Sequence, residues 1–126
     1  MNKLNNNEVE INGEIYVKKS DIKQNNLADT IDGLPLMMVR TYSAGVFFGY
    51  LKRQEGKEVE LLKARRVWYW SGAASLSQLA TEGTSNPSSC KFPCEVTSVI
   101  LTEAIELIPI TDKAAKILNN IPIWKQ

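Results

Sequence analysis

Residues 36–70 decide the fold of this chain, and they read LMMVRTYSAGVFFGYLKRQEGKEVELLKARRVWYW. β-Branched, aromatic and other apolar residues dominate four runs of strand length, a pattern typical of β-structure. Two short polar segments, Ser43–Gly45 and Gln54–Lys57, have the length of hairpin loops. The stretch therefore predicts an antiparallel meander, in which the last run either continues the third strand or bends away near Ala64. The predicted strands are Leu36–Thr41, Val46–Arg53, Val59–Lys63 and Arg65–Trp70.

A helix is predicted directly after these strands. Ser75 is a candidate N-cap, apolar residues follow at helical spacing, and Gly83 is a typical helix end. A loop rich in serine and proline then occupies residues 84–93.

The C-terminal third adds more strand and one more helix. Val96–Leu101 and Ala104–Pro109 predict either a strand pair or one long bent strand. Thr111 or Asp112 is expected to cap a last helix that runs through Asn120. The fold class predicted for the chain is α+β, an antiparallel β-sheet meander with two or three short helices packed on it.

Residues 1–35 differ from the rest of the chain. They hold seven of the ten asparagines and no arginine. Asn12-Gly13 is a strong hairpin signal because both residues tolerate a positive φ. We expect one domain over residues 1–126, in which 36–126 form the core and 1–35 an extension. That extension is predicted to contain a hairpin of Glu8–Ile11 with Glu14–Lys18 and a short helix over Ser20–Leu27.

Composition excludes several classes of function. The formal charge is only +1, from 15 basic and 14 acidic residues, which argues against a general binder of nucleic-acid backbones. The chain has no histidine, so Ser-His-Asp and Cys-His chemistry and every His-ligated metal site are excluded. It also lacks a Gly-rich phosphate loop and an acidic metal cluster. We expect neither an enzyme nor a cofactor.

The same sequence predicts an intracellular protein. The first residues lack the apolar stretch of a signal peptide, and there is no run of about 18 apolar residues that would span a membrane. Cys90 and Cys94 are therefore expected to be reduced thiols.

Basic and aromatic residues are concentrated on the predicted sheet. All four arginines lie between positions 40 and 66, and seven of the ten aromatic residues lie between 42 and 70. Guanidinium groups match phosphate oxygens two at a time, and aromatic rings stack on bases, so this combination suits a nucleotide. Core packing is nevertheless the commoner role for any one strand aromatic. Arg65 and Arg66 are adjacent and point to opposite faces, so one of them must meet the core side or an interface.

Loops beside the sheet offer weaker candidates. Ser43-Ala44-Gly45 could present main-chain N–H groups to an anion, although a plain hairpin loop is the simpler interpretation. Ser75 lies at a helix start, where phosphate is attracted, but capping alone explains it. The polar loop around Asn86 either closes over a ligand or is simply solvated.

Four segments of the chain carry a resemblance to known proteins, and they are Val39–Val46, Ala64–Trp70, Gly72–Ala80 and Leu101–Pro109. Together they resemble a family of small phage-encoded proteins, and the resemblance covers residues 36–118. Within this group the chain is similar to the anti-Thoeris sponge family, the cyclic ADP-ribose–sequestering anti-defence proteins of phages.

The resemblance implies ligand capture without turnover. The implied ligand is glycocyclic ADP-ribose, made by bacterial TIR-domain immunity enzymes, with cyclic oligonucleotides as a second ligand class at a separate site. It also implies a homodimer or higher homo-oligomer in the cytoplasm of the infected bacterial host, without a membrane or nucleic-acid partner. The ligand-binding candidates are Arg40, Tyr42, Ser43, Gly45, Phe47, Arg65, Arg66, Trp70, Ser75 and Asn86.

Two other functions remain open from the residues alone. In one, the protein is a small phage structural or assembly protein, and the aromatic patch is an oligomer interface. The other is a nucleic-acid-binding module, which the near-zero charge disfavours.

Overall fold

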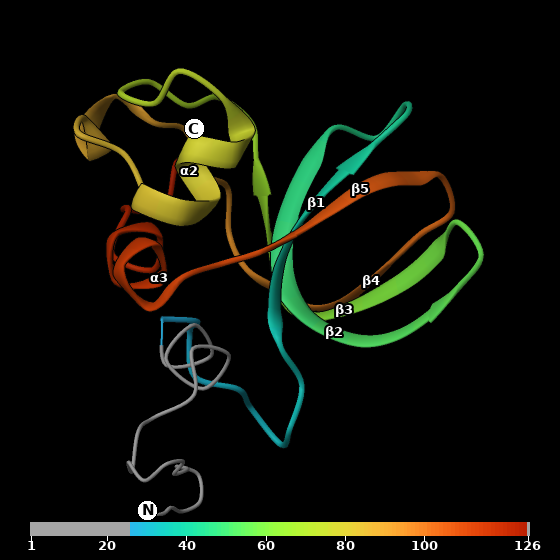
Figure 1. Cartoon of the computed structure of the whole chain (residues 1–126). Helices are drawn as coiled ribbons and strands as arrows, with labels where there is room; N and C mark the ends of the chain where they lie inside the picture. The colour runs from blue at the N-terminus through green and yellow to red at the C-terminus, as the bar shows by residue number, and fades with distance from the viewer. Residues whose placement is uncertain (1–25, 126) are drawn as a thin grey trace, which may run out of the picture.

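The computed structural model describes residues 26–125 and contains, within that range, one β-sheet and a small helical layer (Figure 1). The predicted N-terminal hairpin, and most of the helix predicted over 20–27, fall outside the described residues. The elements are β1 (Leu36–Thr41), β2 (Val46–Glu55), β3 (Glu58–Val67), α2 (Leu76–Glu82), the 3-10 helix η1 (Pro87–Ser89), β4 (Val96–Leu101), β5 (Ala104–Pro109) and α3 (Asp112–Leu118).

The sheet has the strand order β4-β3-β2-β1-β5, and all of its pairs are antiparallel. Strands β1 to β3 pair in sequence order, as in the meander predicted for residues 36–70, and β4 then pairs with β3. Strand β5 returns to pair with β1. For residues 96–109 the sequence predicts a strand pair or one long bent strand; the pairing is wrong, and β4 and β5 instead follow one another around a corner. These two strands occupy opposite edges of the sheet, yet only Thr102 and Glu103 connect them. Because two residues span so little distance, the sheet must curl until its edges converge at this corner.

Both faces of the curled sheet are covered with apolar side chains. Adjacent residues of one strand point to opposite faces, so Met38 and Phe48 join one core while Val39 and Phe47 join the other. The first core fills the space between the sheet and the helices, which Figure 1 shows gathered on one side of the sheet. Phe92 and Leu118 are fully buried in this first core. The second core lies on the other face and includes Val59, Leu61 and Leu101.

Both predicted core helices are confirmed, and local capping explains their ends. The Ser75 hydroxyl accepts a hydrogen bond from the Gln78 N–H at 3.1 Å, and Gly83 ends α2 with a φ of 79°. The Thr111 hydroxyl accepts one from the Ala114 N–H, also at 3.1 Å, at the start of α3. Within residues 26–125, neither helix is long and apolar enough to span a membrane.

The third strand starts one residue before its predicted first residue, Val59, and the run from Arg65 continues it as one of the two predicted alternatives, but only as far as Val67. It runs without a break from Glu58 to Val67, although Lys63 has a φ of 51° and the register with β2 shifts nearby. Trp68 to Trp70 no longer belong to the strand, although the predicted strand extended through Trp70. Trp70 packs instead against the first core.

Phe92 anchors the first core, which yields a prediction about stability. Its ring is 0% exposed and lies 5.8 Å from that of Phe48. The substitution Phe92→Ala should lower the free energy of unfolding by about 3–5 kcal/mol, because it leaves a cavity that the core cannot close. Urea denaturation followed by circular dichroism measures this value.

Ile105→Ala is the matched control, since that side chain is 46% exposed. It should change the free energy of unfolding by less than about 0.5 kcal/mol. A loss below about 1 kcal/mol for Phe92→Ala would contradict the assignment of the core.

Candidate functional site

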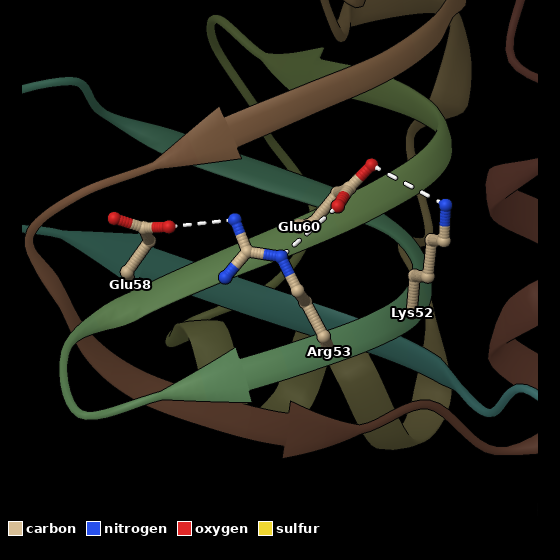
Figure 2. Close-up of polar contacts among 4 residues, drawn as sticks. All are labelled: Lys52, Arg53, Glu58 and Glu60. Atoms are coloured by element: carbon tan, nitrogen blue, oxygen red, sulfur yellow. Dashed lines mark hydrogen bonds and ion pairs between the residues drawn. The ribbon is translucent and has the colours of Figure 1, made fainter.

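Two of the four arginines are engaged in ion pairs on the sheet surface. Arg40 Nε donates to Glu106 Oε1 at 2.9 Å, across the pair of β1 with β5. Arg53 donates to Glu58 at 2.6 Å and to Glu60 at 3.1 Å near the β2–β3 turn, where Lys52 also approaches Glu60 at 3.9 Å (Figure 2). These hydrogen bonds raise the pKa of Arg53. The charge of each guanidinium is therefore already paired with a carboxylate, although only the Nε of Arg40 takes part in its pair.

Arg65 is buried and bound to the main chain. Its side chain is 7% exposed and lies over the ring of Phe92, 5.4 Å from the centroid. It donates to the carbonyl oxygens of Phe92 at 2.8 Å, Ile121 at 3.0 Å, Pro93 at 3.1 Å and, more distantly, Pro122 at 3.5 Å. Arg65 thus ties two separate loops to the sheet, which is a structural role.

Burial and nearby charges act on the pKa of Arg65 in opposite directions. Desolvation lowers the pKa of Arg65, while the nearby Glu95 and Cys94 act in the opposite direction. An arginine stays protonated in proteins even so, and the carbonyl dipoles supply the partners that a buried cation requires.

Arg66, the next residue, is oriented to the opposite face. Its guanidinium carbon lies 4.2 Å from the centroid of the Phe47 ring, and one of its N–H groups donates to the carbonyl of Ala44. Within residues 26–125, its other donors have no hydrogen-bond partner, and no carboxylate forms an ion pair with it. Arg66 is therefore the arginine best placed to accept an anion.

The loop between β1 and β2 lies beside Arg66. Thr41 organises this loop, because its hydroxyl donates to Gly45 O and accepts from Ala44 N, both at 2.8 Å. Gly45 has a φ of 89°, a conformation that favours glycine. Among residues 26–125, the main-chain N–H groups of Ser43 and Gly45 have no protein acceptor.

A concavity of about 400 Å³ joins the loop to the end of β3. It brings together three predicted residues, Ser43, Gly45 and Arg66, with the Phe47 ring under the guanidinium. Trp68 forms part of its wall and is 61% exposed. The residues that line it are Ser43, Ala44, Gly45, Val46, Arg66, Val67 and Trp68. The site therefore combines a cation, loop N–H donors and an open aromatic ring.

The other predicted residues lie elsewhere. Tyr42 is 79% exposed but lines a separate hollow with Glu103 and Ile105. Trp70 is half-buried and donates from its indole nitrogen to Ala73 O at 3.3 Å. Ser75 caps α2, and Asn86 precedes the 3-10 helix, so both belong to the helical layer.

Sequence analysis missed two tryptophans as site residues. Trp68 and Trp124 are stacked, with ring centroids 6.1 Å apart and an interplanar angle of 11°. The sequence offers one signal for Trp68, because alternation along the predicted strand Arg65–Trp70 places it on the face of Arg66. In the structure β3 ends at Val67, but both residues line the concavity. No pattern in the sequence connects Trp124 to either residue.

A second hollow, of about 470 Å³, lies at the border of the first core. Its charged residues are Lys63, Arg65 and Glu95, so cations and an anion face the same space. Burial raises the pKa of Tyr50 in its wall, and Glu95 raises it further. Because Arg65 already donates to four carbonyls, this hollow is less suited to an anion than the concavity beside Arg66.

Metal and disulfide chemistry find no support in the described part of the chain. Cys90 is buried and Cys94 is exposed, and they are not bonded to each other. No group of three or more potential metal ligands occurs within residues 26–125.

Comparison with known proteins identifies a family without assigning a function. A family described as a domain of unknown function (DUF6948) matches residues 35–118, and the chain belongs to it. No curated protein and no solved structure matches the chain.

The contrast between the adjacent arginines yields a prediction about stability. Arg65→Met keeps the length of the side chain but removes every donor, so buried carbonyls lose their partners. The free energy of unfolding should fall by about 3 kcal/mol or more, since hydrogen bonds to charged groups contribute about 1.5–3 kcal/mol each. Arg66→Met should change it by no more than about 1 kcal/mol. Equal effects of the two substitutions in urea denaturation would contradict the structural role of Arg65.

Proposed function

We propose that this DUF6948 protein is a phage anti-defence sponge that binds a cyclic ADP-ribose-type nucleotide and does not degrade it. The proposed ligand is glycocyclic ADP-ribose, and the proposed place of action is the cytoplasm of an infected bacterium that uses TIR-domain immunity enzymes. The observation that carries the proposal is the environment of Arg66. This arginine lies in a concavity next to an exposed aromatic ring, and within residues 26–125 no carboxylate pairs with it.

The chemistry of the concavity fits a pyrophosphate attached to a base. The N–H groups of Arg66 that have no partner within residues 26–125 can donate to two phosphate oxygens together. Ser43 and Gly45, whose N–H groups have no acceptor in the same range, line the same concavity. The exposed Trp68 ring offers a stacking surface, and such a stack contributes about 1–3 kcal/mol per base. A signalling nucleotide supplies both groups in one small molecule.

Capture without cleavage follows from the kinds of group that line the concavity. Its side chains and loop N–H groups donate hydrogen bonds or offer apolar surface, and none is a general base near neutral pH. The nearby Glu103 carboxylate accepts a hydrogen bond of 2.5 Å from the Ser43 hydroxyl. The chain has no histidine to relay a proton to a bound glycosidic or pyrophosphate bond, and we propose that the contact of Ser43 with Glu103 fixes the loop rather than activating the hydroxyl.

A binding experiment tests this proposal. The protein is incubated with cyclic ADP-ribose or glycocyclic ADP-ribose, separated from free nucleotide and heated, and the released nucleotide is identified by chromatography. Wild-type protein should release the nucleotide intact. Arg66→Ala should weaken binding roughly 10- to 100-fold, because it removes charge-assisted hydrogen bonds.

Arg53→Ala is the matched control, since Arg53 lies on the same sheet but is paired with Glu58 and Glu60. It should bind as the wild type does. Release of ADP-ribose would instead identify an enzyme, and no capture by wild-type protein would reject the sponge. Unchanged capture by Arg66→Ala would reject this site alone.

We also propose that the protein is a homo-oligomer, and β4 is the best candidate for the contact between two copies. This strand is an edge of the sheet, and it carries no charged residue along Val96–Leu101. Val96 and Ile100 are 42% and 53% exposed. In an antiparallel pair centred on Ser98, each Val96 would face Ile100 of the second copy, so a two-fold axis makes the edge self-complementary. Native edges are usually protected by charges or proline, and β4 has neither.

Substitution of the edge tests this assembly. Ile100→Lys should convert the oligomer to a smaller species, because a charge would face apolar Val96 of the second copy. Light scattering after size-exclusion chromatography measures the mass. Ile105→Lys on β5 is the control and should leave the mass unchanged. Dissociation by Trp68→Ala, with no nucleotide binding by wild type, would favour the structural or assembly protein instead.

A further inference from the structure

The stacked pair of Trp68 and Trp124 connects the C-terminal end of the chain to the proposed site. Trp68 follows β3 and lines the concavity with Arg66, whereas Trp124 lies beyond the residues that match the family, 35–118. The two rings are nearly parallel, with 11° between their planes. A residue from outside the family match thus supports a residue in the candidate site.

Three short segments of main chain hold this pair in place. Trp68 N donates to Lys91 O at 3.1 Å, and Lys91 N donates to Tyr69 O at 2.8 Å. On the other side of the same segment, Trp124 N donates to Phe92 O at 2.9 Å. Phe92 is fully buried, so the central segment is anchored in the first core.

Lys91 adds a cation to these aromatic rings. Its ammonium nitrogen lies 5.6 Å from the centroid of Trp124 and 5.8 Å from that of Tyr69, and its side chain is exposed. Among residues 26–125 no carboxylate forms an ion pair with it. The aromatic cluster therefore carries positive charge of its own, in addition to that of Arg66.

Trp124 lies parallel to Trp68, with ring centroids 6.1 Å apart, and Trp68 is still 61% exposed. This exposed area of the indole is the surface available for a further ring. An aromatic ring that is already held by its neighbour loses little conformational freedom when a ligand stacks on it. The geometry of the pair thus matches a preorganised stacking surface.

We propose that Trp124 is a positioning residue that holds Trp68 ready to stack on the base of a nucleotide whose phosphates contact Arg66, and that Lys91 contributes attraction for the phosphates. The proposal rests on the proposed function and deepens it. It assigns base recognition to the tryptophan pair and phosphate recognition to Arg66 and the loop. The ligand class is a purine nucleotide with a pyrophosphate.

Two simple probes separate the two halves of the site. ADP carries a base and two phosphates, and inorganic pyrophosphate carries the phosphates alone. Trp124→Ala should weaken the binding of ADP roughly 5- to 10-fold in calorimetry and leave that of pyrophosphate unchanged. Arg66→Ala should weaken both. A purely structural role for Trp124 would affect both probes equally or neither, and either result would overturn the proposal.

Two control variants and one optical signal complete the test. Trp124→Phe keeps a ring in the stack and should restore most of the ADP affinity, while Ile123→Ala, an exposed neighbour, should not alter it. ADP should also quench tryptophan fluorescence in the wild type, and less so in Trp68→Phe. Thermal unfolding verifies that each variant is folded.

The outcomes distinguish this proposal from the proposed function. If wild-type protein binds cyclic ADP-ribose, and Trp124→Ala binds both ADP and cyclic ADP-ribose as tightly as the wild type does, the sponge stands and the positioning role is rejected. If wild-type protein binds ADP in a Trp124-dependent manner but does not bind cyclic ADP-ribose, the stacking surface stands and the sponge is rejected. Binding of neither nucleotide rejects both.

Discussion

The buried guanidinium of Arg65 ties two segments of irregular chain to the sheet. Within residues 26–125, the segment around Phe92 and the C-terminal residues Ile121 and Pro122 are linked by main chain only through the isolated bridges of Tyr69 with Lys91 and of Phe92 with Ile123. Arg65 adds a direct connection from β3 to both segments through their carbonyl oxygens. Those same segments carry Lys91 and Trp124 to the end of β3. Displacement of these segments would separate the stacked indoles of Trp68 and Trp124. Arg65 therefore supports the candidate site from the first core, although it is not one of the residues that line the site.

Arg65 and Arg66 show how one step along a strand changes the chemistry of a residue. Both lie on β3, but adjacent residues of a strand point to opposite faces. Arg65 therefore points to the ring of Phe92 in the first core, and Arg66 to the ring of Phe47 in the second core. Carbonyl oxygens accept hydrogen bonds from the first, whereas within residues 26–125 most donors of the second have no acceptor. Arg40 and Arg53 are balanced by carboxylates. A nearly neutral protein can thus present one strongly anion-attracting position, because its other arginines are compensated locally.

Local signals predicted the elements that depend on local physics. Ser75, Thr111 and Gly83 marked the helix ends, because capping involves residues only a few positions apart. The return of β5 to β1 was not predictable in this way, since it depends on the curl of the whole sheet and on a link of two residues. The same distinction applies to the candidate site. Its loop and Arg66 were predicted from the clustering of basic and aromatic residues on neighbouring strands. The contact of Trp68 with Trp124 was not, because it depends on tertiary packing between segments that are far apart in the sequence.

The position of Trp124 has a consequence for how the proposed binding site is organised. Ser43, Gly45 and Arg66 lie within residues 35–118, which match the family, so the phosphate-binding half would belong to the shared domain. The partner of the stacking ring lies outside this range. Phosphate contacts position a nucleotide without distinguishing one base or ring linkage from another, whereas stacking depends on the shape of the base and its orientation. In the proposed site, discrimination between nucleotide isomers would therefore depend on the tryptophan pair more than on the arginine. Retention of any phosphate-bearing ligand would depend on the arginine.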